Sequence, residues 1–259
     1  MIGAWLSATL ALAQEGLHTN SGREPLPPPL IGFCVLLGVC AIIAVVVMIR
    51  DFRKAKKRRA DLAALAAELF LSFSPDGDNK LAARLAAFNS VCFGFGLVYP
   101  RTACNVLRGN VLGRGVMACD FQFGGKDKTT YSAILATSSC RFDHLLIRPE
   151  GALDRMGWHI DAGDIDFESQ EFSDRFLVKC PDRKFAYDVI TPQMMAMLLD
   201  SDEWIIEAWG HDLLLWKGFA EVSPDELRAG IELAGRFLDL VPEHVRRERA
   251  AGAGAGSVC

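Results

Sequence analysis

The strongest indication of the fold class comes from residues 116–123 (VMACDFQF), 124–128 (GGKDK) and 131–137 (YSAILAT). Every second residue from Met117 to Phe123 is hydrophobic, and this period of two is typical of a strand with one buried face. The polar, glycine-containing middle predicts a turn, and the third segment predicts a returning strand. The sequence therefore predicts a β-hairpin here.

Other short hydrophobic runs predict further strands around this hairpin. They are residues 145–147 (LLI), 175–180 (RFLVKC), 204–209 (WIIEAW) and 213–216 (LLLW). The last two are separated by Gly210-His211-Asp212, which predicts a second hairpin. Because strands do not alternate regularly with helices, we expect no parallel nucleotide-binding sheet. The predicted fold class is α+β, with a curved antiparallel sheet that is either curled or a barrel similar to pleckstrin-homology-like barrels.

Capping signals place two helices late in the chain. Thr191-Pro192 opens a predicted helix over residues 193–199, and Ser223-Pro224 with Glu226 opens another that Pro242 stops. Helical spacing also predicts a connector over residues 60–90, so the globular domain is expected at 91–245, closed by the C-terminal helix. Residues 246–259 contain a low-complexity run of Ala and Gly, which predicts a disordered tail.

Composition and charge exclude several classes of protein. The chain has 259 residues, of which 51% are hydrophobic and 23% are charged, so it is not a wholly disordered protein. Its net charge of −4 argues against a nucleic-acid-binding protein. None of the eight cysteines forms a C-x-x-C pair, which argues against a zinc site and favours buried thiols in a reducing compartment.

Two N-terminal hydrophobic segments predict a membrane protein. Residues 1–13 (MIGAWLSATLALA) resemble a signal peptide, either cleaved or retained as an interfacial segment. Residues 14–29 form an extracytoplasmic spacer that ends in a proline-rich run. Residues 30–49 are twenty residues without a charge, about 30 Å of helix, which is the thickness of the hydrocarbon core. We therefore expect one transmembrane helix at 30–49.

A basic collar at residues 50–59 follows the predicted span. It holds seven basic residues and one acidic residue, whereas the chain from residue 60 onward has 20 Lys and Arg against 29 Asp and Glu. The positive-inside rule then predicts a single-pass protein of the inner membrane, with its N-terminus outside and its C-terminal domain in the cytoplasm. The collar is either a simple stop-transfer signal or a site for anionic lipid headgroups. The predicted lipid-binding residues are Arg53, Lys54, Lys56, Lys57, Arg58 and Arg59.

An acidic run between Asp161 and Glu171 is the best candidate for a functional surface. On a strand, Asp164, Asp166 and Glu168 share one face, which is either a solvated face, a partner-binding patch or a cation site. The run lacks the spacing of an EF-hand, so no metal or cofactor is predicted. The alternative function is a metal-dependent hydrolase that uses this run together with His159.

Other candidates for chemistry are weaker. His144 and His159 are the plausible cytosolic bases, but no catalytic motif accompanies them, so no catalytic residue is assigned. Arg148-Pro149-Glu150 predicts the end of a strand, with an arginine that forms a local ion pair or binds phosphate. Phe93-Gly94-Phe95-Gly96 lacks the spacing of a phosphate-binding loop and favours a bend or an edge strand.

The order of several short motifs resembles a set of uncharacterised bacterial single-pass membrane proteins. The motifs are RPE at 148–150, DIDFES at 164–169, EFS at 171–173, FAYDV at 185–189 and PQMM at 192–195. The resemblance covers roughly residues 60–242 and implies a membrane helix, a basic collar and a cytosolic α+β domain. It implies no activity.

The expected function is that of a membrane-anchored, non-enzymatic interaction module. Its expected ligand is a protein, bound at Asp164, Asp166 and Glu168, or a lipid headgroup, bound at the collar. A third possibility is a subunit whose membrane helix pairs with another helix, although Gly32 and Gly38 lack the spacing of four that such pairing favours.

Overall fold

The computed structural model describes residues 28–88, 90–91, 100–123, 130–150, 163–218 and 221–251. The chain divides into two compact units, with the boundary between Ala55 and Lys56. The predicted signal-like segment, the Gly-containing passage at 93–96, His159, Asp161 and the end of the tail from residue 252 lie outside the described residues.

The first described element is helix α2, Pro28–Glu68, which crosses the boundary between the two units. Its first residues, Pro28 and Pro29, belong to the expected proline-rich spacer; proline is tolerated in a first helical turn because the N–H groups there have no partner within the helix. The helix continues without a break through the basic collar and ends where the globular unit begins its sheet.

The predicted transmembrane helix is not supported. Among the residues searched, no helix is both long enough and apolar enough to cross a membrane. The prediction of a span at 30–49 and the single-pass topology built on it are therefore wrong.

Six strands of the described residues form one antiparallel sheet. They are β1 (Ser72–Ser74), β2 (Pro100–Val111), β3 (Arg114–Phe123), β4 (Thr130–Pro149), β5 (Phe176–Lys179) and β6 (Ile205–Trp216). The order is β1-β2-β3-β4-β5, and β6 also pairs with β4. The predicted hairpin is confirmed, because Met117 of β3 lies opposite Leu135 of β4.

The sheet is open, so the predicted closed barrel is wrong. Closure requires the outermost strands to pair with each other. Within the described part of the chain, however, β1 pairs only with β2, and β6 pairs only with β4. With only three residues, β1 also offers little backbone for a further pairing. The architecture is an α+β fold on an open antiparallel sheet.

The second predicted hairpin is also wrong, because residues 205–216 form one continuous strand. Gly210 adopts a positive φ of 61°, which glycine tolerates, but β6 pairs with β4 on both sides of it. Asp212 lies opposite Thr137 while Gly210 lies opposite Phe142, so the extra residues belong to β4. Gly210 therefore marks a bulged region of the β4–β6 pair rather than a reversal of the chain.

Six shorter helices surround the sheet. They are α3 (Asn79–Leu85), α5 (Gln170–Arg175), α6 (Arg183–Val189), α7 (Pro192–Leu199), α8 (Pro224–Leu240) and α9 (Glu243–Ala251). Two predicted starts are confirmed: the Thr191 side chain accepts from the Met194 N–H, and Ser223 forms a capping box with Glu226. Residues 246–251 lie in α9 rather than in a disordered tail.

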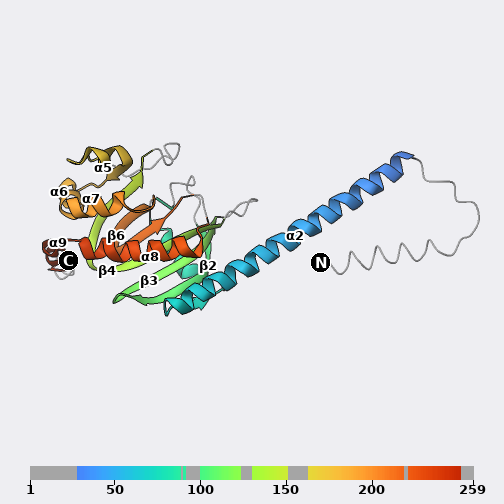
Figure 1. Cartoon of the computed structure of the whole chain (residues 1–259), viewed down its shortest axis with the longest axis horizontal. Helices are drawn as coiled ribbons and strands as arrows, with labels where there is room; N and C mark the ends of the chain where they lie inside the picture. Colours follow the sequence, from blue (N-terminus) through green and yellow to red (C-terminus); the bar gives the residue numbers. More distant parts are fainter. Residues whose placement is uncertain are drawn as a thin grey trace, which may run out of the picture. The chain divides into compact units, whose positions relative to one another are not determined.

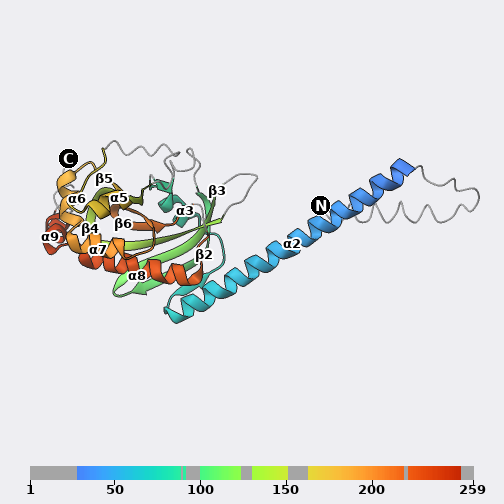
Figure 2. The same ribbon diagram turned by 45° about the horizontal axis from the view of Figure 1, so that its top comes forward.

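Each face of the sheet buries its own hydrophobic core. Ile134 and Ala136 of β4 pack with side chains of α8, whereas Ala133 and Leu135 pack on the opposite face with α3. Figure 2 shows α3 and α8 on opposite sides of the sheet, and Figure 1 shows α8 lying across it. This alternation is the period of two that the sequence displays, and it fixes the register of the central strands.

Candidate functional site

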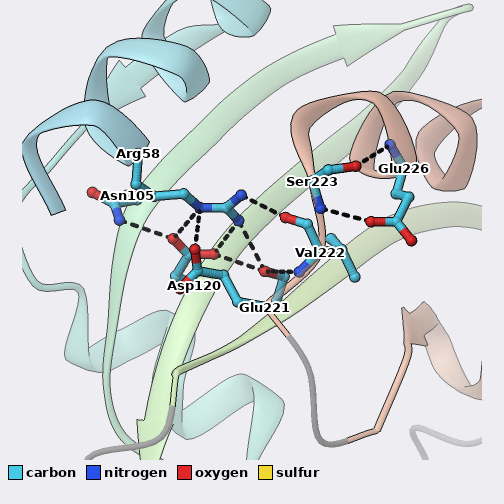
Figure 3. Close-up of polar contacts among 8 residues, drawn as sticks. Arg58, Asn105, Asp120, Glu221, Val222, Ser223 and Glu226 are labelled. Carbon is cyan, nitrogen blue, oxygen red and sulfur yellow. Dashed lines mark hydrogen bonds and ion pairs between the residues drawn. The ribbon is translucent and has the colours of Figure 1, made fainter. Parts of the chain in front are cut away.

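A buried polar cluster joins α2, the sheet and the start of α8 (Figure 3). Its centre is Asp120 of β3, whose side chain is 1% exposed. Arg58 of α2 donates from Nη2 to Asp120 Oδ1 at 2.8 Å and from Nε to Asp120 Oδ2 at 3.2 Å. Asn105 and Ser132 donate to the same carboxylate. We call these four residues the Arg58 cluster.

Arg58 is the cation of the cluster, and Glu221 lies 3.6 Å from its Nε as a second carboxylate beside Asp120. Arg58 also donates to the backbone oxygen of Val222, next to the cap of α8, and to the hydroxyl of Ser132. Burial lowers the pKa of Arg58, but the hydrogen bond and charge of Asp120 outweigh it, so that the pKa lies above its usual value. The cluster stays charged and holds three elements together, which is a structural role.

Arg58 therefore does not fit its predicted role in binding lipid headgroups. Its side chain is 9% exposed and already occupied by Asp120, so it is inaccessible to a headgroup. The other predicted members of the collar are exposed: Arg53, Lys54, Lys56, Lys57 and Arg59. The sequence does not distinguish Arg58 from its neighbours, because the acceptor lies 62 positions away along the chain.

His144, a predicted candidate base, contacts a buried carboxylate. Its Nε2 lies 2.5 Å from Glu207 Oε1, and the other oxygen of Glu207 accepts from the Ser90 N–H at 2.7 Å. Glu207 is fully buried, and the indole of Trp209 lies edge-on to the imidazole. Sequence reasoning missed Glu207, since nothing in the run WIIEAW marks its glutamate as buried. No nucleophile is described in hydrogen-bond contact with His144, so the pair lacks the third group of a catalytic triad.

The acidic segment is extended but is not a strand of the sheet. Asp164 forms a single bridge with Lys179, and its Oδ1 accepts from the N–H groups of Ile165 and Val178 at 2.9 and 3.0 Å. The expected alternation nevertheless holds: Asp164, Asp166 and Glu168 are exposed, whereas Ile165 and Phe167 are buried. The residues the structure describes contain no group of three His, Cys, Asp or Glu side chains that could hold a metal ion.

Several contacts hold this segment rigidly. The Ser173 hydroxyl accepts from the Phe167 N–H and donates to the Phe167 oxygen, at 3.0 and 3.3 Å. The Tyr187 hydroxyl donates to the Asp166 backbone oxygen at 3.0 Å, and its ring packs on Phe167 at 5.2 Å between centroids. Tyr187 is 46% exposed. We call Asp164, Asp166, Glu168 and Tyr187 the acidic patch.

Tyr187 belongs to the FAYDV motif, to which the sequence assigned no role. Helix α6 positions it: Asp182 caps the helix by accepting from the Phe185 N–H, and Phe185 and Ala186 are buried beneath. Tyr187 then falls on the outer side of α6 beside the acidic segment. The periodicity of a seven-residue helix could indicate that it is exposed, but its neighbours are set only by the tertiary fold.

Arg148 and a pocket beside β1 are two further candidates for binding charged ligands. Arg148 is buried at the end of β4 at 5% exposure, where a soluble phosphate has no access, and the Glu150 N–H donates to Arg175 O. A pocket of about 330 Å³ lies between β1 and α3, lined by residues that include Asp78 and Arg108, which pair with each other at 2.8 Å. Its charges are balanced, so it shows no preference for an anion or a cation.

Two of the described cysteine thiols, those of Cys119 and Cys180, are unsuited to nucleophilic catalysis. Burial raises the pKa of Cys180 to about 11 and raises that of Cys119 well above its usual value. Both thiols are therefore protonated at neutral pH, and a protonated thiol is a weak nucleophile. Cys119 and Cys180 are among the five described cysteines that form no disulfide.

Comparisons with known proteins identify a similar fold but assign the chain to no family. The chain matches no protein-family model and no curated protein. Among solved structures, its fold is similar to that of the mycobacterial trehalose monomycolate transport factor A, TtfA, with a TM-score of 0.53 and 17% identity. The similarity covers 73% of this chain and 94% of that one. At this identity it shows a shared fold.

Proposed function

We propose that this chain is a non-enzymatic interaction module that binds a basic segment of a protein partner at the acidic patch. The observation that carries the proposal is the exposure of Asp164, Asp166 and Glu168 on a segment whose alternate residues are buried. The carboxylates are presented in a fixed row, so binding costs little conformational entropy on this side.

Tyr187 gives the acidic patch the anchor that binding surfaces favour. Tyrosine is enriched among the residues that carry most of the binding energy at protein interfaces, and charged residues around it add specificity and speed of association. The ring is half-exposed and fixed by its contacts with Phe167 and the Asp166 oxygen. A partner with Lys or Arg residues beside an apolar side chain complements this arrangement.

The similarity to TtfA supports the same function class. That protein is named for transport, and its name carries no enzymatic activity. The buried ionic groups described above, which include the Arg58 cluster and the His144–Glu207 contact, are occupied by one another rather than aimed into a shared cleft.

The decisive experiment compares partner capture by three forms of the full chain. Asp166→Asn with Glu168→Gln removes two charges and leaves the backbone contacts of Asp166 intact. The matched control, Glu203→Gln with Glu232→Gln, removes two exposed charges elsewhere. We expect the patch variant to capture at least tenfold less partner than the wild type, and the control to capture as much as the wild type. Equal capture by all three forms would refute the acidic patch as the binding surface.

A second candidate function is binding of anionic lipid headgroups by the collar. The specific observation is that Arg53, Lys54, Lys56, Lys57 and Arg59 are all exposed along two turns of α2. Each cation near an anionic surface adds about 1 kcal/mol. Lys56→Gln with Lys57→Gln should weaken cosedimentation with phosphatidylglycerol vesicles, whereas Arg236→Gln with Arg247→Gln should not. Identical vesicle binding by both variants would reject the collar as a lipid-binding site.

A further inference from the structure

The end of α2 exposes an aromatic side chain in an unfavourable backbone conformation. The Phe70 N–H donates to Ala67 O and the Leu71 N–H to Ala66 O, at 3.3 and 2.8 Å, which is the hydrogen-bond pattern of a Schellman motif. In this motif Phe70 takes the left-handed position, with φ of 55°, that glycine usually fills. Its side chain is 94% exposed, so no contact within the described domain repays the strain.

The turn between β2 and β3 repeats this combination. Its two residues are Leu112 and Gly113, with φ of 52° and 79°, the left-handed pair that a tight hairpin requires. Asn-Gly is the favoured sequence for such a turn, because asparagine tolerates positive φ better than leucine does. Leu112 is 71% exposed. Here too a strained residue presents an apolar side chain to solvent.

Strand register places both side chains at one end of the sheet. Ser72 of β1 lies opposite Arg108 of β2, and Ser74 lies opposite Val106. Leu71, the residue after Phe70, lies beside Gly109 of β2, because a Cβ at Gly109 would lie 3.4 Å from Leu71 Cα. Phe70 therefore lies near the end of β2 that leads into the turn at Leu112. Residues held in sparsely populated backbone conformations cluster at functional sites. Because both side chains are also largely exposed, Phe70 and Leu112 are candidates for one contact surface.

The charges that flank the two side chains are mixed and balanced. Glu68, two residues before Phe70, pairs with Arg228, and Arg114, two residues after Leu112, pairs with Asp239 at 2.7 Å. A surface of one sign would repel its own copy. A surface with both signs around an apolar centre is complementary to itself under a two-fold axis.

We propose that Phe70 and Leu112 form the centre of a two-fold interface between two copies of this chain. The adjoining strand β1 supports it, because β1 pairs only with β2 among the described strands and so leaves one edge open beside Phe70. Antiparallel pairing of β1 with its copy would extend the sheet across the dimer.

The expected dimer is weak. A phenylalanine buries on the order of 200 Å², so two copies of Phe70 and Leu112 together supply roughly half of the 1,200–2,000 Å² of a stable interface. The rim charges and the three-residue edge of β1 supply the rest. We therefore expect dissociation in the micromolar range, visible as a mass that rises with concentration.

Sedimentation equilibrium of the full chain tests the proposal. Phe70→Gly with Leu112→Asn removes both apolar side chains and relieves both strained conformations. We expect this variant to dimerise at least tenfold more weakly and to melt at a higher temperature than the wild type, so that the loss is not due to unfolding. The matched control is Phe52→Ser, which removes an aromatic side chain that is 72% exposed in the other unit.

Three results would overturn the proposal. The first is a wild-type chain that stays monomeric up to about 100 µM, a concentration at which a micromolar dimer forms. The second is an unchanged dissociation constant in Phe70→Gly with Leu112→Asn. The third is a dimer that is lost in Phe52→Ser and kept in the double variant, which would place the interface on α2.

Discussion

Asp120 shows how much a single buried side chain organises. It accepts hydrogen bonds from Arg58, Asn105 and Ser132, which belong to α2, β2 and β4. A buried ion pair gains little over well-packed apolar residues, but removing one partner leaves a charge without compensation. The Arg58 cluster is therefore a strong constraint on how α2 docks, whatever its net contribution to stability.

Asp120→Asn should lower the free energy of unfolding by about 3–5 kcal/mol, because Arg58 would remain charged and buried. Urea denaturation of the variant and the wild type measures this. The control is Arg58→Met with Asp120→Leu, which replaces the pair by apolar side chains and should recover most of the loss. If the double variant is as unstable as Asp120→Asn, the effect comes from packing rather than from the unpaired charge.

Glu226 gives the domain a pH-dependent stability at its α8 cap. Hydrogen bonds from Lys217 and from Ser223 lower its pKa from 4.5 to about 2. Because the folded-state pKa lies below the unfolded one, the contribution is present above pH 4.5 and is lost as the pH falls toward 2. Glu226 is well exposed, so solvent screening keeps the contribution under about 1 kcal/mol.

The difference in unfolding free energy between wild type and Glu226→Gln should therefore be larger at pH 6 than at pH 2.5. Urea titrations at both values measure it. A difference that does not change between the two values would show that the carboxylate is not held in its charged form by the cap.

At the scale of elements, α8 packs so closely on the sheet that one of its glycines is required. A Cβ at Gly230 would lie 2.5 Å from Ile134 Cδ1 and 2.7 Å from Trp204 Cζ2. Glycine normally weakens a helix interior by roughly 1 kcal/mol relative to alanine, so its presence here reflects the close approach.

Gly230→Ala should destabilise the domain by about 1–3 kcal/mol, despite the better helix propensity of alanine, because two packed core side chains must move. Gly235→Ala on the same helix is the matched control: its Cβ would meet Leu112 Cδ1 at an ordinary 3.5 Å, and we expect a gain of about 0.5–1 kcal/mol. Thermal unfolding of both variants measures these changes in stability. A change of the same sign in both variants would contradict the proposed close packing at Gly230.

At the scale of the whole molecule, the unit boundary at Ala55 and Lys56 leaves Arg58 in the globular unit. Residues 56–68 of α2 are part of that unit's core, since Leu62, Leu65 and Ala66 are buried in it. The last turns of α2 are therefore needed for the domain to fold stably.

A fragment of residues 56–259 should melt within a few degrees of the full chain. A fragment of residues 60–259 lacks Arg58 and should lose about 3–5 kcal/mol, because Asp120 stays buried without its partner. Calorimetry of the two fragments tests this, with Arg58→Met in the longer one as control for the side chain alone. Equal melting temperatures for the two fragments would show that Arg58 does not hold the unit together.

Features that depend on near neighbours along the chain can be predicted from the amino-acid sequence alone. The period of two predicted the β3–β4 hairpin, and the side chains of Thr191 and Ser223 predicted where α7 and α8 begin. The alternation at residues 164–168 predicted which side chains are exposed. These signals act within a few residues, so their physical causes are present in any short window of the chain.

Features that depend on partners far away along the chain become visible only in the folded domain. The local sequence around Gly210 predicts a turn, whereas the structure shows β4 pairing on both sides of it. The local sequence likewise predicts an exposed collar residue at Arg58, whereas the structure pairs Arg58 with Asp120. The open sheet, the burial of Glu207 and the position of Tyr187 beside Asp166 belong to the same class. Pairings between residues tens of positions apart are selected by the packing of the whole core, and no local pattern encodes them.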